Sequence, residues 1–227
     1  AGHPRPDYPG RMRDTYHVEL DAISTSLVEL TNLVGSAMSR ATTALLDADL
    51  ILAEGVITGD EPVDALCRDV EARGFDLLAR QQPVASDLRI IVTSLRMVAD
   101  LERMGDNAVH VAKIARRRYP SSAVPPGLRA IVLQMGHAAE EIVIKAGSVI
   151  AGRDVAMAVQ LEKDDDVMDE LHRQLFTEIL DDSWADGVEP AIDITLAGRY
   201  YERFADHAVS VARRVVYLVT GQHVTVP

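Results

Sequence analysis

The amino-acid sequence predicts an all-α fold made of two tandem, homologous three-helix bundles, with six long helices in total. Apolar residues recur at steps of three and four over long proline-poor stretches, which is the period of an amphipathic helix. Hydrophobic residues make up 48% of the chain but aromatic residues only 4%, so the core must consist of small and aliphatic side chains, which suit packed helices. The phrase at 101–112 also returns in a second version at 201–212, which indicates an internal duplication.

Three helices are expected in the first half. The first is long and covers about 14–52, where the apolar residues keep the helical spacing. Two glycines and Pro62 break this pattern, and a second helix follows over about 61–80. Pro83 interrupts the chain again, and helical spacing resumes in a third helix over about 90–118.

The second half repeats this order. The segment 119–127 has three prolines and no helical period, so it is the expected linker. Helices are predicted after it over about 128–150, 155–182 and 191–220. The apolar run 215–219 is the one stretch that a strand could also explain.

These elements give the expected division of the chain. Residues 1–11 contain three prolines and two glycines and resemble an expression scar. The other expected parts are a first three-helix bundle (12–118), the linker (119–127), a second three-helix bundle (128–221) and a tail (222–227).

Composition excludes several classes of protein. The formal net charge is −12, which argues against a nucleic-acid binder because such proteins carry a basic face. The single Cys67 cannot form an internal disulfide, so it is expected to be a small buried residue in a reducing compartment. No uncharged apolar run reaches 18 residues. We therefore expect a cytoplasmic protein that meets a membrane only through partners.

Each half carries two acidic pairs with a four-residue spacing, which places each pair on one helix face. The candidate metal ligands are Asp60, Asp64, Glu102 and Asp106 in the first half, and Asp165, Asp169, Glu202 and Asp206 in the second. Like charges at this spacing destabilise a helix by roughly 0.2–0.5 kcal/mol, so a repeated acidic pair suggests compensating cations. Oxygen ligands favour magnesium, manganese, calcium or ferric iron, with zinc less favoured.

Other interpretations of these carboxylates stay open. They could form a solvated helix face paired with nearby cations, for which Arg68, Arg103, Arg173 and Arg203 are the candidates. They could also belong to a metal-dependent enzyme or a metal-storage bundle, or to a metal-free scaffold. Asp169 and His172 have an Asp-x-x-His spacing, but the Glu-x-x-His pairs of a di-iron bundle are absent. Since no nucleophile elbow or phosphate-binding loop is present, no enzyme is expected.

Two kinds of phrase give the chain a family resemblance over about 12–221. The segment 80–89 reads Arg-Gln-Gln-Pro-Val-Ala-Ser-Asp-Leu-Arg, and 101–106 reads Leu-Glu-Arg-Met-Gly-Asp, with Tyr-Glu-Arg-Phe-Ala-Asp as its echo at 201–206. These resemble the "RQQPVAxDLR" and "LERIGD" phrases of the PhoU family, in particular its actinobacterial members of the PhoY type. The echo has Ala205 where the family phrase has glycine, but it keeps both carboxylates.

The resemblance implies two similar three-helix bundles whose acidic motifs bind multinuclear metal clusters in some members. It also implies a non-enzymatic negative regulator of phosphate uptake and of the phosphate-starvation response. Its implied partners are a sensor histidine kinase and the ATPase subunit of the phosphate-specific ABC transporter. We also expect a homodimer, because the long helices carry faces of small residues.

Overall fold

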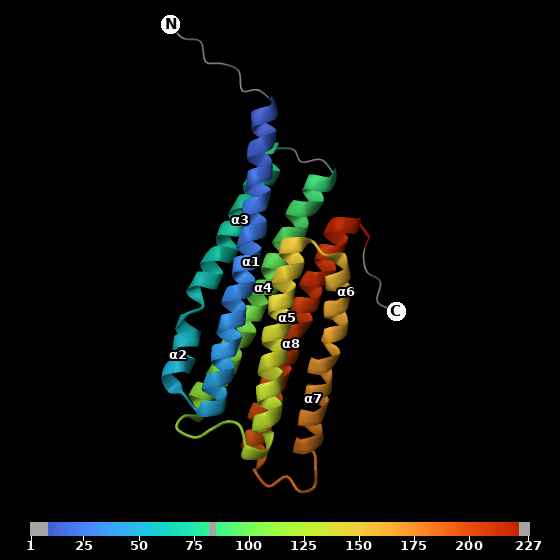
Figure 1. The fold of residues 1–227 in the computed structure, drawn as a ribbon. Coiled ribbons are helices and arrows are strands. Elements are labelled where there is room, and N and C mark those ends of the chain that lie inside the picture. Colours follow the sequence, from blue (N-terminus) through green and yellow to red (C-terminus); the bar gives the residue numbers. More distant parts are fainter. Residues whose placement is uncertain (1–8, 82–84, 223–227) are drawn as a thin grey trace.

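The computed structural model describes residues 9–81 and 85–222, and every regular element in these ranges is helical. The elements are α1 (Pro9–Asp47), α2 (Leu50–Thr58), α3 (Glu61–Gln81), α4 (Ala85–Arg118), the 3₁₀ turn η1 (Pro126–Leu128), α5 (Arg129–Gly152), α6 (Val155–Asp164), α7 (Asp166–Ile179) and α8 (Val188–Thr220). Figure 1 shows an elongated bundle in which α2 and α3 flank one side and α6 and α7 the other. The predicted all-α fold is confirmed.

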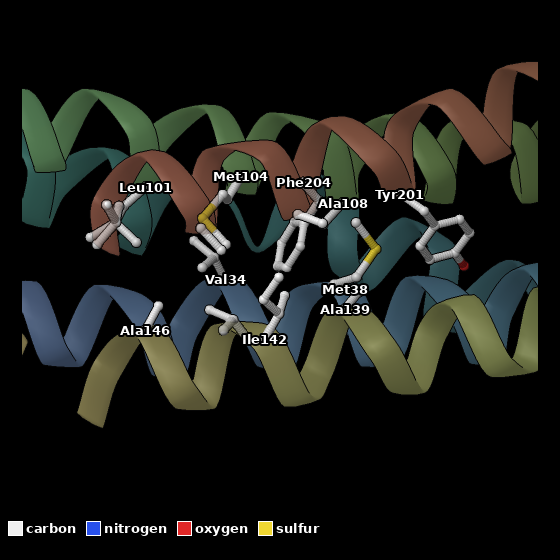
Figure 2. Close-up of a cluster of buried hydrophobic side chains, with 14 of the residues drawn as sticks. Val34, Met38, Leu101, Met104, Ala108, Ala139, Ile142, Ala146, Tyr201 and Phe204 are labelled. Carbon is white, nitrogen blue, oxygen red and sulfur yellow. The ribbon is translucent and has the colours of Figure 1, made fainter. Parts of the chain in front are cut away.

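The two halves share one hydrophobic core. Helices α1 and α4 of the first half pack against each other and against α5 and α8 of the second. Figure 2 shows side chains from all four helices meeting between them, among them Met38, Met104, Ile142 and Phe204. Tyr201 is fully buried there, and its hydroxyl lies 2.8 Å from Thr42 Oγ1 on α1. The duplicated units are therefore fused along their length.

Buried ion pairs also join the halves. Asp100 on α4 accepts a hydrogen bond from Arg214 on α8 at 2.5 Å, and its other oxygen lies 3.2 Å from His207 Nδ1. At the C-terminus of α4, Arg117 and Arg118 both pair with Asp193, which is buried near the start of α8. A buried carboxylate needs such partners to remain ionised. These contacts fix the register of α4 against α8.

The expected linker is a packed connection. Ala123 and Val124 are buried, and so is Leu128 in the following turn. These residues insert into the shared core beside the ends of the long helices, since they belong to the same cluster. The chain thus passes from one half to the other without leaving the packed surface.

The predicted first helix over 14–52 lies too late in the chain, because α1 begins at Pro9 and ends at Asp47, and residues 50–58 form the separate helix α2. Ala48 adopts a left-handed φ of 52°, which stops α1. Asp49 then caps α2 by accepting a hydrogen bond from Leu52 N at 2.9 Å. The second half repeats this corner at Arg153 and Asp154.

The other boundaries differ less. The predicted helix 155–182 is divided at Asp165 into α6 and α7, while α4 and α8 begin a few residues earlier than expected. Residues 215–219 are helical, so the strand alternative is wrong there. The break at Pro83, residues 1–8 of the N-terminal segment and 223–227 of the tail lie outside the described residues, while residues 9–11 belong to α1.

Candidate functional site

In each half, the outer helices are the flanking pair, α2 and α3 or α6 and α7, and they carry the first of the two acidic pairs. The first aspartate of this pair lies between the two outer helices. Asp60 directly precedes α3, and Asp165 lies between α6 and α7. The carbonyl of each accepts a hydrogen bond from the backbone N–H four residues later, at 3.2 Å for Asp64 and at 3.2 Å for Asp169. Both outer acidic pairs therefore lie in the first turn of a helix, where negative charge is favoured.

The second acidic pair of each half lies on a central helix that packs against this outer helix. Glu102 and Asp106 belong to α4, which contacts α3, and Glu202 and Asp206 belong to α8, which contacts α7. The neighbouring apolar residues of each motif point into the shared core, whereas the carboxylates are half-buried or exposed. The acidic residues thus line the seam between the outer and central helices.

In the first half the four carboxyl groups affect one another electrostatically. Burial, followed by the charges of Asp64 and Asp106, raises the pKa of Asp60 above its ordinary value, and Glu102 contributes in the same direction. A side chain at Gly105 would place its Cβ 3.3 Å from Asp60 Oδ1. The glycine therefore lets the Asp60 carboxylate lie against the α4 backbone.

The second half has the same arrangement with a stronger effect. Burial raises the pKa of Asp165 to about 7, with help from the charges of Asp169, Asp206 and Glu202. Burial and the charge of Glu202 also raise the pKa of Asp206. The predicted grouping of two acidic pairs in each half therefore agrees with the electrostatics of both seams.

Among the described residues, arginine pairs account for two of the eight carboxylates. Asp106 pairs with Arg103 at 2.8 Å, and Glu202 pairs with Arg199. Two of the other proposed cations bind elsewhere, since Arg68 pairs with Glu61 and Arg173 with Glu170. Within 9–81 and 85–222, no ion pair forms with the remaining candidates, which are Asp60, Asp64, Glu102, Asp165, Asp169 and Asp206. A solvated helix face paired with arginines therefore explains only part of this acidic set.

The side chains do not already form a closed coordination shell. Among the described residues, no three His, Cys, Asp or Glu side chains lie together as they would around a metal ion. The donor set nevertheless fits a hard cation, because each seam offers carboxylate oxygens whose mutual repulsion a cation would relieve. Side-chain rotation would have to complete such a site.

One residue beside each seam lies outside the candidate ligands that the sequence predicted, Cys67 in the first half and His172 in the second. The Cys67 thiol is buried, and burial together with the charges of Glu102 and Asp64 raises its pKa to about 12. His172 Nδ1 lies 3.8 Å from Glu202 Oε2. The available signal was the repeat itself, because Cys67 and His172 are 105 residues apart, as are Asp64 and Asp169.

The other two histidines near the motifs contact side chains of the opposite half. His207 contacts Asp100, and His110 stacks on Tyr200 with ring centroids 4.8 Å apart.

No helix in the described ranges is both long and apolar enough to cross a membrane.

Comparison with known proteins gives the same duplicated pattern. The family model described as the PhoU domain matches twice, at residues 27–115 and 132–215. A Mycobacterium tuberculosis relative, "Phosphate-specific transport system accessory protein PhoU homolog 2", is 50% identical over 92% of this chain and 99% of its own length. A Mycobacterium leprae protein, PhoU homolog 1 of the same system, is also 50% identical, over 92% of this chain and 95% of its own.

Solved structures share the fold. The crystal structure of PhoU from Pseudomonas aeruginosa superposes with a TM-score of 0.82 at 32% identity, covering 91% of this chain and 100% of the other. The phosphate transport system regulatory protein PhoU from Streptococcus pneumoniae has a TM-score of 0.84 at 26% identity, with 93% and 100% covered. With two matching domains, near full-length relatives at 50% identity and the same fold, this chain belongs to the PhoU family.

Proposed function

We propose that this protein is a cytoplasmic, non-enzymatic regulator of inorganic phosphate uptake that represses the phosphate-starvation response when phosphate is plentiful. The observation that carries the proposal is the 50% identity to mycobacterial accessory proteins of a phosphate-specific transport system over nearly their whole length. The names of these relatives describe accessory proteins and not enzymes. Such a role needs binding surfaces but no catalytic residue.

The proposed regulator acts as an adaptor. It contacts a sensor histidine kinase on one side and the ATPase subunit of the phosphate-specific ABC transporter on the other, and so couples the state of the transporter to the kinase. A rigid bundle suits this role, because the shared core and the buried pairs at Asp100 and Asp193 keep the two halves in fixed register. A homodimer formed through the long helices is part of the proposal.

The eight carboxylates are proposed to hold metal ions that organise the acidic seams. Asp60, Asp64, Glu102 and Asp106 would bind in the seam of the first unit (12–118), and Asp165, Asp169, Glu202 and Asp206 in that of the second (128–221). The raised pKa values of Asp60 and Asp165 support this, because neighbouring carboxylates add to the effect of burial and a bound cation would offset their repulsion. A hard cation supplies charge compensation there and can anchor an anionic partner group.

Co-purification tests the adaptor role. The tagged full-length protein is isolated from cells grown with and without phosphate, and the kinase and the transporter ATPase are quantified in the eluate. The proposal predicts that both partners associate and that the amount bound depends on phosphate. Asp182→Asn, which removes one exposed loop carboxylate outside the acidic seams, is the control and should bind both partners as the wild type does. No association with either partner under both conditions would contradict the proposal.

A further inference from the structure

The N-terminal part of α8 exposes a stripe of large apolar side chains. Val188, Ile192 and Leu196 follow one another at a spacing of four residues and are 76%, 54% and 37% exposed. Residues at this spacing lie on one helix face, so the stripe runs along roughly 12 Å of helix. Contiguous exposed apolar surface marks interaction sites, whereas single exposed apolar residues need no such explanation.

The stripe lines an open groove with a volume of about 520 Å³. The other lining residues come from α8 or from the connection between α7 and α8, and they are Trp184, Gly187, Ala191 and Thr195. A small molecule is usually enclosed over most of its surface, which a groove built along one helix does not provide. The shape suits a helix of another protein that lies along α8.

Trp184 is fixed in this groove by hydrogen bonds within the connection. Its indole Nε1 donates to the Gly187 carbonyl at 2.9 Å, and its backbone N–H donates to the Asp181 carbonyl, also at 2.9 Å. Gly187 has φ 88° and ψ 177°, a conformation essentially confined to glycine. A half-buried tryptophan with a satisfied N–H is a rigid aromatic anchor of the kind that dominates interface energies.

Two carboxylates, Asp181 and Asp186, form the rim of the groove. Asp181 begins the turn that carries Trp184, and Asp186 directly precedes Gly187. Both are exposed, and neither forms an ion pair in the part of the chain that the structure describes. Residues 183–198 contain no Lys or Arg. The edge of the apolar surface is therefore negatively charged.

The arginines that reach this end of α8 are already engaged. Arg117 and Arg118 of α4 both pair with Asp193, and Arg118 also pairs with Glu189 at 2.7 Å. The rim carboxylates therefore keep their charge for a binding partner.

This charge selects among the possible occupants. A second copy of the chain in a symmetric contact would set the rim carboxylates against themselves, on a chain whose formal net charge is −12. An anionic membrane surface would be repelled in the same way. A helix with one apolar face and flanking Lys or Arg side chains matches both the groove and its rim.

The first half has a different surface at the matching place. The residues 100 positions earlier are Leu88, Val92 and Arg96, and Arg96 is exposed. A positive charge within the stripe disfavours a basic helix there. Because α4 begins at the upper end of the bundle in Figure 1 and α8 at the lower end, the two ends of the protein present different surfaces.

We propose that the groove at the start of α8 binds a basic amphipathic helix of an adaptor partner. The apolar face of that helix covers the stripe and Trp184, and its Lys or Arg side chains lie beside Asp181 and Asp186. This inference rests on the proposed adaptor role and adds the surface that one partner uses and the chemistry of the helix that it recognises.

Binding of the purified partners to the full-length protein tests the groove. The sensor histidine kinase in detergent and the transporter ATPase subunit are each titrated against wild type and Leu196→Arg, which introduces the residue of the first half. The variant should weaken at least one partner about tenfold or more. Ile51→Arg, at an isoleucine of α2 that is 86% exposed, is the matched control and should change neither. Circular dichroism confirms that both variants are folded.

The rim is tested by association kinetics. Asp181→Asn/Asp186→Asn should slow the association of the partner that Leu196→Arg weakens and reduce the salt dependence of that rate. An unchanged rate and salt dependence would overturn the basic character of the bound helix.

Photo-crosslinking identifies the occupant. The crosslinking residue p-benzoylphenylalanine is incorporated at Val188, and the crosslinked peptide is sequenced by mass spectrometry. The inference predicts an amphipathic segment of one partner that is rich in Lys and Arg. A segment of a second copy of this chain, or an acidic segment, would overturn it.

The outcomes separate this inference from the adaptor role. Equal affinities of wild type and Leu196→Arg for both partners overturn the groove as a binding surface and leave the adaptor role intact. A wild type that binds neither purified partner overturns the adaptor role, and this inference with it.

Discussion

Replacing Asp165 by asparagine should stabilise the metal-free protein at alkaline pH and give a smaller gain in mild acid. Burial, with the charges of Asp169 and Asp206, raises the pKa of Asp165 from 3.8 to about 7. A carboxyl group whose pKa is higher in the folded than in the unfolded state costs stability when it is ionised. The cost is complete above about pH 7 and disappears as the pH falls toward about 4.

The size of the effect follows from the surroundings of Asp165. A difference of about three in pKa corresponds to at most about 4 kcal/mol, and partial exposure of the group reduces this to about 1–2 kcal/mol. Its side chain makes no capping hydrogen bond to α7, so asparagine loses only the charge at the helix N-terminus, about 0.5 kcal/mol. The net gain is about 1 kcal/mol, which raises Tm by about 2–4 °C.

Thermal unfolding followed by circular dichroism measures this gain. Wild type and Asp165→Asn are compared with a chelator at about pH 8 and about pH 5. Asp182→Asn, in the exposed loop after α7, is the control and should leave Tm unchanged at both values. A lower Tm for Asp165→Asn at the higher pH, or the same gain at both, would refute the explanation by burial and repulsion.

Three further changes probe the packing. Arg214→Ala should destabilise the fold by about 1–3 kcal/mol, since it removes a partner of buried Asp100. Burial alone would raise the pKa of Asp100, but hydrogen bonds from His207 and Arg214 hold it below its usual range. The stability that ionised Asp100 contributes should therefore be lost as the pH falls through this lowered pKa. Urea unfolding of wild type and Arg214→Ala at neutral and at acidic pH measures both effects. Gly147→Ala should cost about 1–3 kcal/mol, because its Cβ would lie 2.6 Å from Thr31 Oγ1; an unchanged Tm would show that α1 and α5 can separate. Ala48→Gly should add about 0.5–1 kcal/mol in thermal melts by relieving a left-handed φ, and a loss would contradict that strain.

The sequence was sufficient to predict the fold class and the grouping of the acids. Helical spacing and the repeats at offsets of 105 and 100 predict which helices correspond. Because α3 and α7 are joined to their central helices by short connections, antiparallel packing brings the acidic pairs of each half to one seam. The capped corners at Asp49 and Asp154, 105 residues apart, follow the same repeat.

Other features depend on tertiary contacts. The break at Asp165 lacks the glycines and the proline that mark the break of the first half, so the apolar periodicity predicts one continuous helix across it. Its local signal is the run Asp164-Asp-Asp166, since aspartate favours helix starts over helix interiors. The pairing of Asp100 with His207 and Arg214 joins residues more than 100 positions apart, which no local pattern encodes.

The metal content of the protein tests the central claim, that the carboxylates form cation centres, most directly. Wild type, a Glu102→Gln/Asp106→Asn variant and a Glu61→Gln control are purified without chelator and analysed for bound elements. Glu61 is an exposed neighbour that pairs with Arg68 outside the acidic set. We predict that wild type and control retain the same metal and that the double variant loses that of the first half. Equal metal content in all three, or none in the wild type, would contradict the claim.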